Sequence, residues 1–345
     1  MGRLPLYKDF TLPESTKCNN RGLLFDKFCD HWNPNWSLGT NKKNWLSKFT
    51  GLAGDSVLIE DFVYRRQLMV ENLGGKLVFM RTDGRFVTGT GNEHPVENGF
   101  TWHPILGTPY IPGTTVKGFL RTWLAQQGQE NLMADMFGSP ETGVGGAVFF
   151  DALPVTPVKL IVDVMTPHYS QYYQGTAPPG DWQLPNPIPF LVVDTGQSFM
   201  FSFYHRDSGP GEILDVIENN LTEALDYLGA GAKTAVGYGR FVLDAREKEK
   251  YESRKELLRE ELRQKRELAQ MSPIKREMLA DGFEDDTTFL SKIERWLDRA
   301  EKSEGQDRRD IALALKGWYE QFRPSYYENP NKKNKERIER IKALL

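Results

Sequence analysis

Long apolar runs are missing from this sequence: no stretch reaches the roughly 18 apolar residues that a membrane-spanning helix needs. The N-terminus, MGRLPLYKDF, also lacks the apolar segment of a signal peptide, and Leu6 stands where N-myristoylation needs Ser or Thr. The two cysteines, Cys18 and Cys29, fit neither a metal-binding spacing nor a disulfide framework. We therefore expect a protein of the reducing cytoplasm with no membrane segment.

Histidine is scarce as well, and the five histidines never stand three or four residues apart as zinc ligands on a helix do. A nucleotide-binding P-loop is excluded too. The run Gly229-x-Gly231-x-Lys233-Thr234 places Ala232 before the lysine, and a helix precedes this loop where a P-loop follows a strand. No metal and no cofactor are expected.

The sequence also lacks an excess of positive charge, since the net charge of the 345 residues is −3. Residues 1–245 hold 19 basic and 25 acidic residues, whereas residues 246–345 hold 25 basic and 22 acidic ones. An RNA site on the acidic part must therefore be a local patch, and the acidic surface around it suits protein partners. The charge balance favours a subunit of an assembly over a free-standing RNA-binding protein.

One glycine-rich stretch, LGAGAKTAVGYGRF at residues 228–241, is the most informative feature that is present. Glycines allow positive φ and close approach of a ligand to the backbone, and a cation beside an aromatic ring suits a phosphate and a base. The alternative is a glycine-rich hairpin with incidental polar residues. The residues concerned are Gly229, Gly231, Lys233, Thr234, Gly237, Tyr238 and Arg240.

A second segment, GTPYIPGTTVKGFLR at residues 107–121, predicts a helix that starts after a Pro-Gly turn. Thr114 or Thr115 can cap this helix, and Lys117 and Arg121 lie on one of its faces. A helix start with free N–H groups and two nearby cations is an anion site. The alternative is an ordinary capped amphipathic helix with solvated cations.

Together the two segments resemble the RAMP superfamily of CRISPR proteins, in which a PG-[ST]-[ST]-x-K-G-x-x-R helix start precedes a glycine-rich loop. Four further stretches are similar to the sixth-subunit family of the type III-B (Cmr) effector complex. They are Gly22–Lys27, Phe149–Ala152, Asp163–Tyr169 and Gly231–Gly239. The resemblance covers roughly residues 20–245 and implies a non-cleaving subunit.

The order of predicted elements is that of an α+β, ferredoxin-like (RRM-like) sheet with helices on one face, and the resemblance implies the same fold. Helices are expected near residues 23–32, 42–49, 60–71, 112–127 and 213–228. Strands are expected at residues 76–90 with a turn at 83–84, at 147–155 and 159–165 as neighbours able to pair, and at 196–205 and 239–243.

Three regions follow from this pattern: an N-terminal helical segment (1–70), a RAMP ferredoxin-like RNA-binding domain (71–245) and a helical extension (246–345). The extension begins with a charged helix at residues 246–267 and continues with amphipathic helices that offer Trp296 and Trp318 as core residues. Its role cannot be read from the sequence.

The loop at residues 166–189 is too long to be a simple connection. Its aromatic residues, which include His168, Tyr169, Tyr172 and Tyr173, either stack on splayed bases or pack the loop onto the sheet.

The resulting hypothesis is a non-catalytic RNA-binding and assembly subunit of a type III-B CRISPR (Cmr) effector complex. It would cap the backbone near the 3′ region of the guide RNA (crRNA), in antiviral defence. Its expected partners are guide RNA and the other RAMP subunits of the complex, with target RNA as a further partner. The predicted RNA-binding residues are Thr114, Thr115, Lys117, Arg121, His168, Tyr169, Gly229, Gly231, Lys233, Thr234, Gly237, Tyr238 and Arg240. The alternative is a RAMP endoribonuclease that processes guide RNA precursor, with His31, Asp26 or Asp30 as catalytic candidates.

Overall fold

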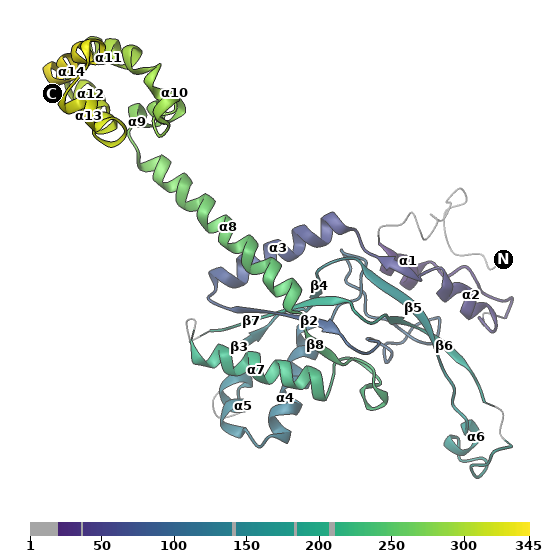
Figure 1. Ribbon diagram of the computed structural model, residues 1–345. Coiled ribbons are helices and arrows are strands. Elements are labelled where there is room, and N and C mark those ends of the chain that lie inside the picture. Colours follow the sequence, from purple (N-terminus) through teal and green to yellow (C-terminus); the bar gives the residue numbers. More distant parts are fainter. Residues whose placement is uncertain (1–19, 36, 140–142, 183–184, 207–210) are drawn as a thin grey trace. The chain divides into compact units, whose positions relative to one another are not determined.

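The computed structural model describes residues 20–35, 37–139, 143–182, 185–206 and 211–345 (Figure 1). The chain divides into two compact units, residues 1–250 and 251–345, each with its own hydrophobic cluster. No helix in the described ranges is long and apolar enough to cross a membrane.

The central sheet of the first unit has the ferredoxin-like order. Its strands are β2 (Lys76–Thr82), β3 (Ala147–Phe149), β7 (Ser198–His205) and β8 (Phe241–Leu243), arranged β3-β7-β2-β8, with the short β4 (Leu153–Pro154) also paired to β7. All of these pairs are antiparallel. Helix α4 (Gly113–Gln126) connects β2 to β3, and α7 (Glu212–Tyr227) connects β7 to β8. The predicted α+β, ferredoxin-like class is confirmed.

Helices cover both faces of this sheet, whereas the sequence predicted helices on one face only. Phe199, Phe201 and Phe203 alternate along β7 and belong to the same buried cluster as the apolar side of α7. Met200 points to the other face, where α3 (Ser56–Asn72) packs against β2, β4 and β7. Figure 1 shows α3 on one side of the sheet and α4, α5 (Glu130–Phe137) and α7 on the other. Helix α3 therefore covers part of the sheet face that an RRM leaves open.

A second, three-stranded sheet has the order β1-β5-β6, formed by Gly51–Ala53, Val158–Met165 and Ile188–Val193. The prediction that residues 147–155 and 159–165 pair is wrong, because β5 pairs with β1 and β6 while β3 pairs with β7. Strands β5 and β6 extend as an arm whose connecting segment contains the short helix α6 (Ser170–Tyr173) (Figure 1).

The N-terminal helices are α1 (Arg21–Lys27) and α2 (Asn41–Ser47), which are shorter than predicted. Helix α3 begins four residues before its predicted start, because the Asp55 carboxylate accepts hydrogen bonds from Val57 N and Leu58 N and caps the helix. The strand predicted for residues 76–90 ends at Thr82.

The second unit is helical. Helix α8 (Ala245–Gln270) begins in the first unit, and α9 to α14 follow at Pro273–Ala280, Asp286–Leu290, Ile293–Lys302, Gly305–Phe322, Pro324–Glu328 and Lys332–Leu344. Trp296 and Trp318 are fully buried in its core, as the sequence predicted.

Candidate nucleic-acid interface

The glycine-rich loop connects α7 to β8 and wraps around the chain that follows β2. Gly239 N donates to Arg85 O at 2.8 Å, and Ala232 N donates to Val87 O at the same distance. These bonds explain why β2 does not continue beyond Thr82: the segment after it pairs with the loop instead.

The loop's own folding requires three of its four glycines. Gly229, Gly231 and Gly239 have φ of 72°, 83° and 74°. A Cβ at these positions would lie 2.7 Å or less from backbone oxygens of Gly239, Val87 and Ala230 respectively. The sequence interpretation assigned these glycines to close approach of a ligand, but here the approaching group is the protein's own backbone.

Gly237 differs from these three glycines. Its φ of 91° also favours glycine, yet a Cβ there would meet nothing within 4 Å. It follows a short 3-10 turn, η1 (Thr234–Val236), and its N–H bonds to the Thr234 carbonyl. The tip of the loop is therefore open to solvent at Gly237.

Tyr238 attaches this loop to strand β5. Its hydroxyl donates to Asp163 Oδ2 at 2.5 Å, and Arg85 donates to the same oxygen at 2.6 Å. Burial together with the Asp163 hydrogen bond raises the pKa of Tyr238 to about 12. Although burial opposes ionisation of Asp163, the hydrogen bonds from Tyr238 and Arg85 lower the pKa of its carboxyl below the ordinary value. Asp163 is thus a fixed anion that holds the loop.

Lys233 carries the cation that is available in this loop. It has a left-handed backbone (φ 63°), which is unfavourable for a residue with a Cβ. Its ammonium nitrogen lies 3.1 Å from Met165 Sδ and 5.5 Å from the centre of the Phe190 ring. No carboxylate pairs with Lys233 among the residues that the structure describes. The loop therefore presents a half-buried ammonium with only soft partners.

Arg240, by contrast, is already paired. Its Nε lies 2.8 Å from Asp226 Oδ1 and 3.9 Å from Asp83 Oδ2. An anion at Arg240 would have to compete with these two carboxylates. Of the two cations predicted in this loop, Lys233 is the better placed.

The start of α4 is occupied by an acidic side chain. The helix begins at Gly113, and Asp151 Oδ1 accepts a hydrogen bond from Gly113 N at 2.7 Å. Neither Thr114, which is exposed, nor Thr115, which is half-buried, caps the helix. The expectation of a threonine cap was wrong, and the Asp151 carboxylate takes the place that an anionic ligand would have used.

Lys117 and Arg121 lie on α4 but make no contact that joins them to the glycine-rich loop among the contacts described. The Lys117 ammonium lies 5.7 Å from the centre of the Phe137 ring, and Arg121 is exposed. Helix α4 approaches the loop through Trp123, whose ring stacks on Tyr227 at 5.6 Å where α7 ends. A shared binding site of α4 and the loop thus remains a prediction.

Gly118 is a feature of α4 that the sequence interpretation did not use. It is exposed in the middle of the helix, and a Cβ there would meet nothing within 4 Å. An exposed glycine inside a helix costs about 0.5–1 kcal/mol relative to alanine. Packing within the described chain gives no reason for that cost.

His168 and Tyr169 lie on the arm, with ring centres 6.3 Å apart. His168 is exposed and Tyr169 is half-buried, whereas Tyr172 and Tyr173 are exposed. The exposed Tyr172 and Tyr173 rings do not pack the loop onto a sheet, so that alternative is set aside for these two residues.

The candidates for a nuclease site face groups of their own fold. Asp30 Oδ1 lies 2.6 Å from His31 Nδ1 and 3.2 Å from Lys48 Nζ, and Asp26 Oδ1 lies 3.3 Å from His94 Nε2. The described residues contain no group of three or more His, Cys, Asp or Glu that could hold a metal ion. Asp163 contacts the glycine-rich loop through Tyr238, and its lowered pKa makes it a weak base.

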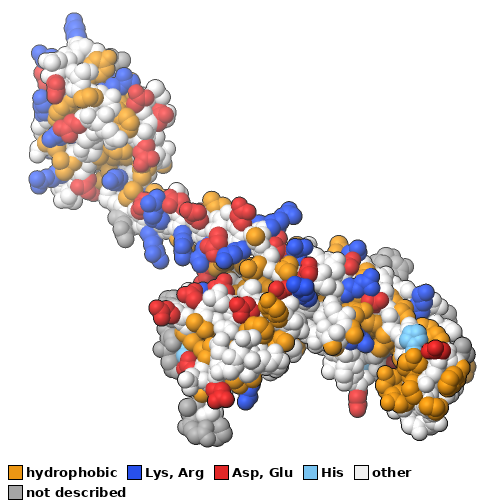
Figure 2. Space-filling view, turned by 60° about the horizontal axis from the view of Figure 1, so that its bottom comes forward, with side chains coloured by type: hydrophobic (Ala, Val, Ile, Leu, Met, Phe, Trp, Pro, Cys, Tyr) orange, Lys and Arg blue, Asp and Glu red, His pale blue; other side chains and the backbone are white. Residues whose placement is uncertain are grey.

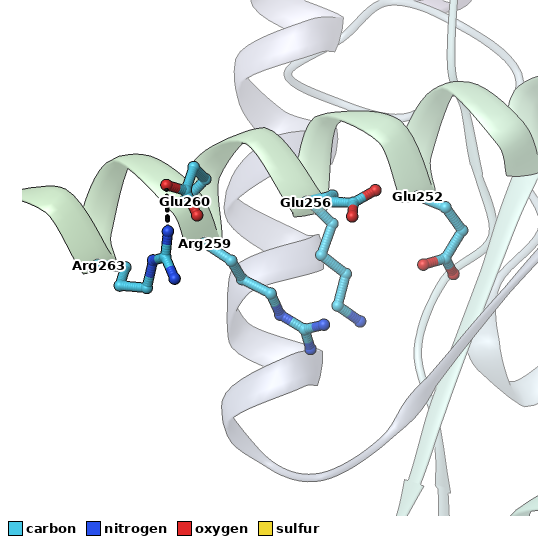
Figure 3. Close-up of a pocket in the computed structure, with 6 residues that line it drawn as sticks. Glu252, Glu256, Arg259, Glu260 and Arg263 are labelled. Atoms are coloured by element: carbon cyan, nitrogen blue, oxygen red, sulfur yellow. Dashed lines mark hydrogen bonds and ion pairs between the residues drawn. The ribbon is translucent and has the colours of Figure 1, made fainter.

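A groove along α8 is lined by side chains of that helix alone (Figure 3). Glu260 accepts a hydrogen bond from Arg263 at 2.8 Å. Because acids and bases of a single helix face alternate there, the groove has neither a convergent set of groups nor one sign of charge. The lining residues are Glu252, Lys255, Glu256, Arg259, Glu260 and Arg263.

The sequence of this region is also similar to a known protein superfamily. Residues 79–242, from β2 to β8, match the RAMP superfamily model. This match agrees with the resemblance that the helix-start and glycine-loop motifs carry.

Among individual proteins, the chain is similar to Cmr6 subunits. It is 29% identical over 229 residues to the CRISPR system Cmr subunit Cmr6 of Pyrococcus furiosus, covering 47% of this chain and 66% of the relative. It is 29% identical over 150 residues to the Cmr6 subunit of Saccharolobus solfataricus, covering 43% of this chain and 49% of that relative. The chain thus spans just under two thirds and about half of these relatives.

The fold is also similar to a solved structure. A chain of the type III-B Cmr-beta complex, determined by cryo-EM with cognate target RNA bound, matches with a TM-score of 0.50 and 24% identity. The match covers 60% of this chain and 72% of that chain. At this identity it supports the fold alone.

Proposed function

We propose that the protein is a non-catalytic RNA-binding and assembly subunit of a type III-B CRISPR effector complex. Its partners would be guide RNA, target RNA and the other Cmr-type subunits, and it would cap the backbone near the 3′ region of the guide RNA in antiviral defence. The similarity to Cmr6 in sequence, and to a Cmr-beta chain in fold, supports this proposal.

The single observation that carries the RNA-binding part is the position of Lys233. Its ammonium lies against Met165 and Phe190 rather than against a carboxylate, beside the open backbone at Gly237. A phosphate oxygen offers this cation a far stronger partner than a thioether or an aromatic face. The Tyr238–Asp163 hydrogen bond fixes the loop, so the ammonium is positioned before RNA arrives.

The charge of the surrounding unit supports assembly. With a net charge of −6 over residues 1–245, an isolated chain repels a polyanion beyond the local patch. Neighbouring subunits would supply the remaining positive field. Base stacking by His168 and Tyr169 fits the same proposal only where phosphates are held by other residues, because residues 160–205 contain no lysine or arginine.

Cross-link mapping tests this proposal. The full chain is reconstituted with its sibling type III-B subunits and guide RNA, irradiated, and digested to peptides. We expect RNA cross-links on the peptide that contains Lys233, and their loss in Lys233→Ala but not in Lys43→Ala, an exposed lysine of α2. Cross-links confined to residues 251–345, or equal loss in both variants, would contradict the proposal.

Cleavage separates this proposal from the endoribonuclease alternative. The purified chain should leave repeat RNA intact with and without Mg²⁺. Metal-dependent cleavage that disappears in Asp26→Asn would favour the alternative.

A further inference from the structure

The tip of the arm, described at residues 166–182 and 185–187, lies beyond the last pair of the β5–β6 ladder, Met165 with Ile188. Figure 2 shows hydrophobic side chains gathered at the lower right of the view, where the arm lies, with histidine coloured next to them. The tip of the arm is thus apolar, on a unit whose net charge is negative.

Aromatic side chains at this tip are exposed to an unusual degree. The exposed fractions are 52% for Tyr172, 75% for Tyr173 and 73% for Trp182. The Tyr172 and Tyr173 rings contact each other edge to face at 5.7 Å. Trp182 packs against Gly180, where a Cβ would lie 2.2 Å from its ring. These rings are held in place while facing solvent, and covering them would recover about 25 cal/mol for each Å² of apolar surface.

The charge of the arm discriminates between RNA and protein as the covering partner. No lysine or arginine stands between Lys159 and Arg206, and the tip itself carries one charge, that of Asp181. Single-stranded RNA sites combine aromatic platforms with a basic groove for the phosphates. Protein interfaces instead have cores rich in Tyr and Trp and poor in charge. An acidic residue beside apolar rings also disfavours a polyanion.

We propose that the arm tip is a protein-docking surface that inserts Tyr173 and Trp182 into an apolar pocket on a neighbouring subunit of the assembly. A basic group at the rim of that pocket pairs with Asp181. This inference rests on the proposed function, since it assumes a complex of sibling subunits. It assigns protein contact to Tyr173 and Trp182 at the arm tip, and leaves RNA contact to the glycine-rich loop and to His168 and Tyr169.

The test uses the full chain and an RNA-free subassembly of its sibling type III-B subunits, prepared by nuclease digestion. The variant is Tyr173→Ser with Trp182→Ser, and the control is Leu257→Ser, which changes an exposed apolar residue of α8. We expect the double variant to weaken association with the subassembly at least tenfold. Its melting temperature and the guide RNA affinity of the isolated chain should not change, and the control should bind as the wild type does.

The other outcomes overturn the inference. A loss of guide RNA affinity in the isolated double variant, with or without loss of association, would identify base stacking. Unchanged association would show that the tip is not an interface. Failure of the wild-type chain itself to associate would contradict the proposed function, and the docking surface with it, whereas failure of the double variant alone leaves the proposed function intact.

Discussion

Tyr238 and Asp163 stand 75 residues apart in the chain, and the tyrosine hydroxyl lies 2.5 Å from the aspartate carboxylate. This bond joins the loop that follows α7 to strand β5, and therefore joins the candidate RNA site to the base of the arm. Arg85, from the segment that the loop encloses, donates to the same carboxylate. Three segments of the chain thus meet at one anion.

Removal of the hydroxyl in Tyr238→Phe should destabilise the first unit by about 1–2 kcal/mol, because Asp163 loses a charge-assisted partner but keeps Arg85. Chemical denaturation measures this change. An unchanged free energy of unfolding would show that the bond contributes nothing in solution.

The pH dependence of the Tyr238–Asp163 hydrogen bond follows from the raised pKa of the Tyr238 hydroxyl. The folded-state pKa of Tyr238, about 12, exceeds its ordinary value of 10.0. The stabilisation by its hydroxyl is therefore complete below pH 10 and is lost as the pH rises through about 12. The tyrosinate absorbance of the wild type minus that of Tyr238→Phe should titrate near pH 12. A difference titration centred at pH 10 would contradict the hydrogen bond.

Gly118→Ala should stabilise the protein by about 0.5–1 kcal/mol, since the helix gains propensity and the Cβ meets no atom. If a ligand or subunit approaches α4 closely, the same change should weaken assembly on guide RNA. Gly317→Ala is a matched control, because Gly317 is also exposed within a helix, α12, with open space around it. Equal behaviour of the two variants in assembly would show that α4 is only structural.

The second unit has a core of its own, so damage there should remain local. Trp318→Ala removes a fully buried indole and should cost that unit about 3–5 kcal/mol. Calorimetry should show one transition shifted to lower temperature and the other unchanged. A single transition that shifts as a whole would mean that the two units unfold together.

Much of the fold was predictable because it depends on local pattern. The apolar alternation in β7 and the 3.6-residue period of α7 follow from the sequence alone. The pairing of the strands does not follow from the sequence alone. The apolar pattern of β5 is compatible with pairing to β3 or to β6, and the three-dimensional packing selects β6. The cover of α3 over the second sheet face depends on the same packing.

The sequence located residues of the candidate site, but it did not predict which partners they contact or what each residue does. The motifs located Lys233 and Tyr238, but their partners Phe190 and Asp163 come from distant segments. Asp163 stood in a recognised stretch without an assigned partner, and Asp151 took the helix start that the threonines were expected to cap. Ion pairing of Arg240 likewise involves Asp226, 14 residues away on α7. Such pairings depend on the tertiary structure, and the spacing of residues in the sequence does not predict them.

The salt dependence of guide RNA binding tests the central claim most directly. In the reconstituted assembly, the slope of log K against log salt should fall by about one in Lys233→Ala, because one phosphate contact and its released counterion are lost. Lys233→Gly should show the same loss of slope and be about 1 kcal/mol more stable than Lys233→Ala, since glycine accepts the left-handed backbone at this position. A wild-type slope and affinity in both variants, with Lys43→Ala as the reference, would contradict the assignment of the glycine-rich loop as the RNA site.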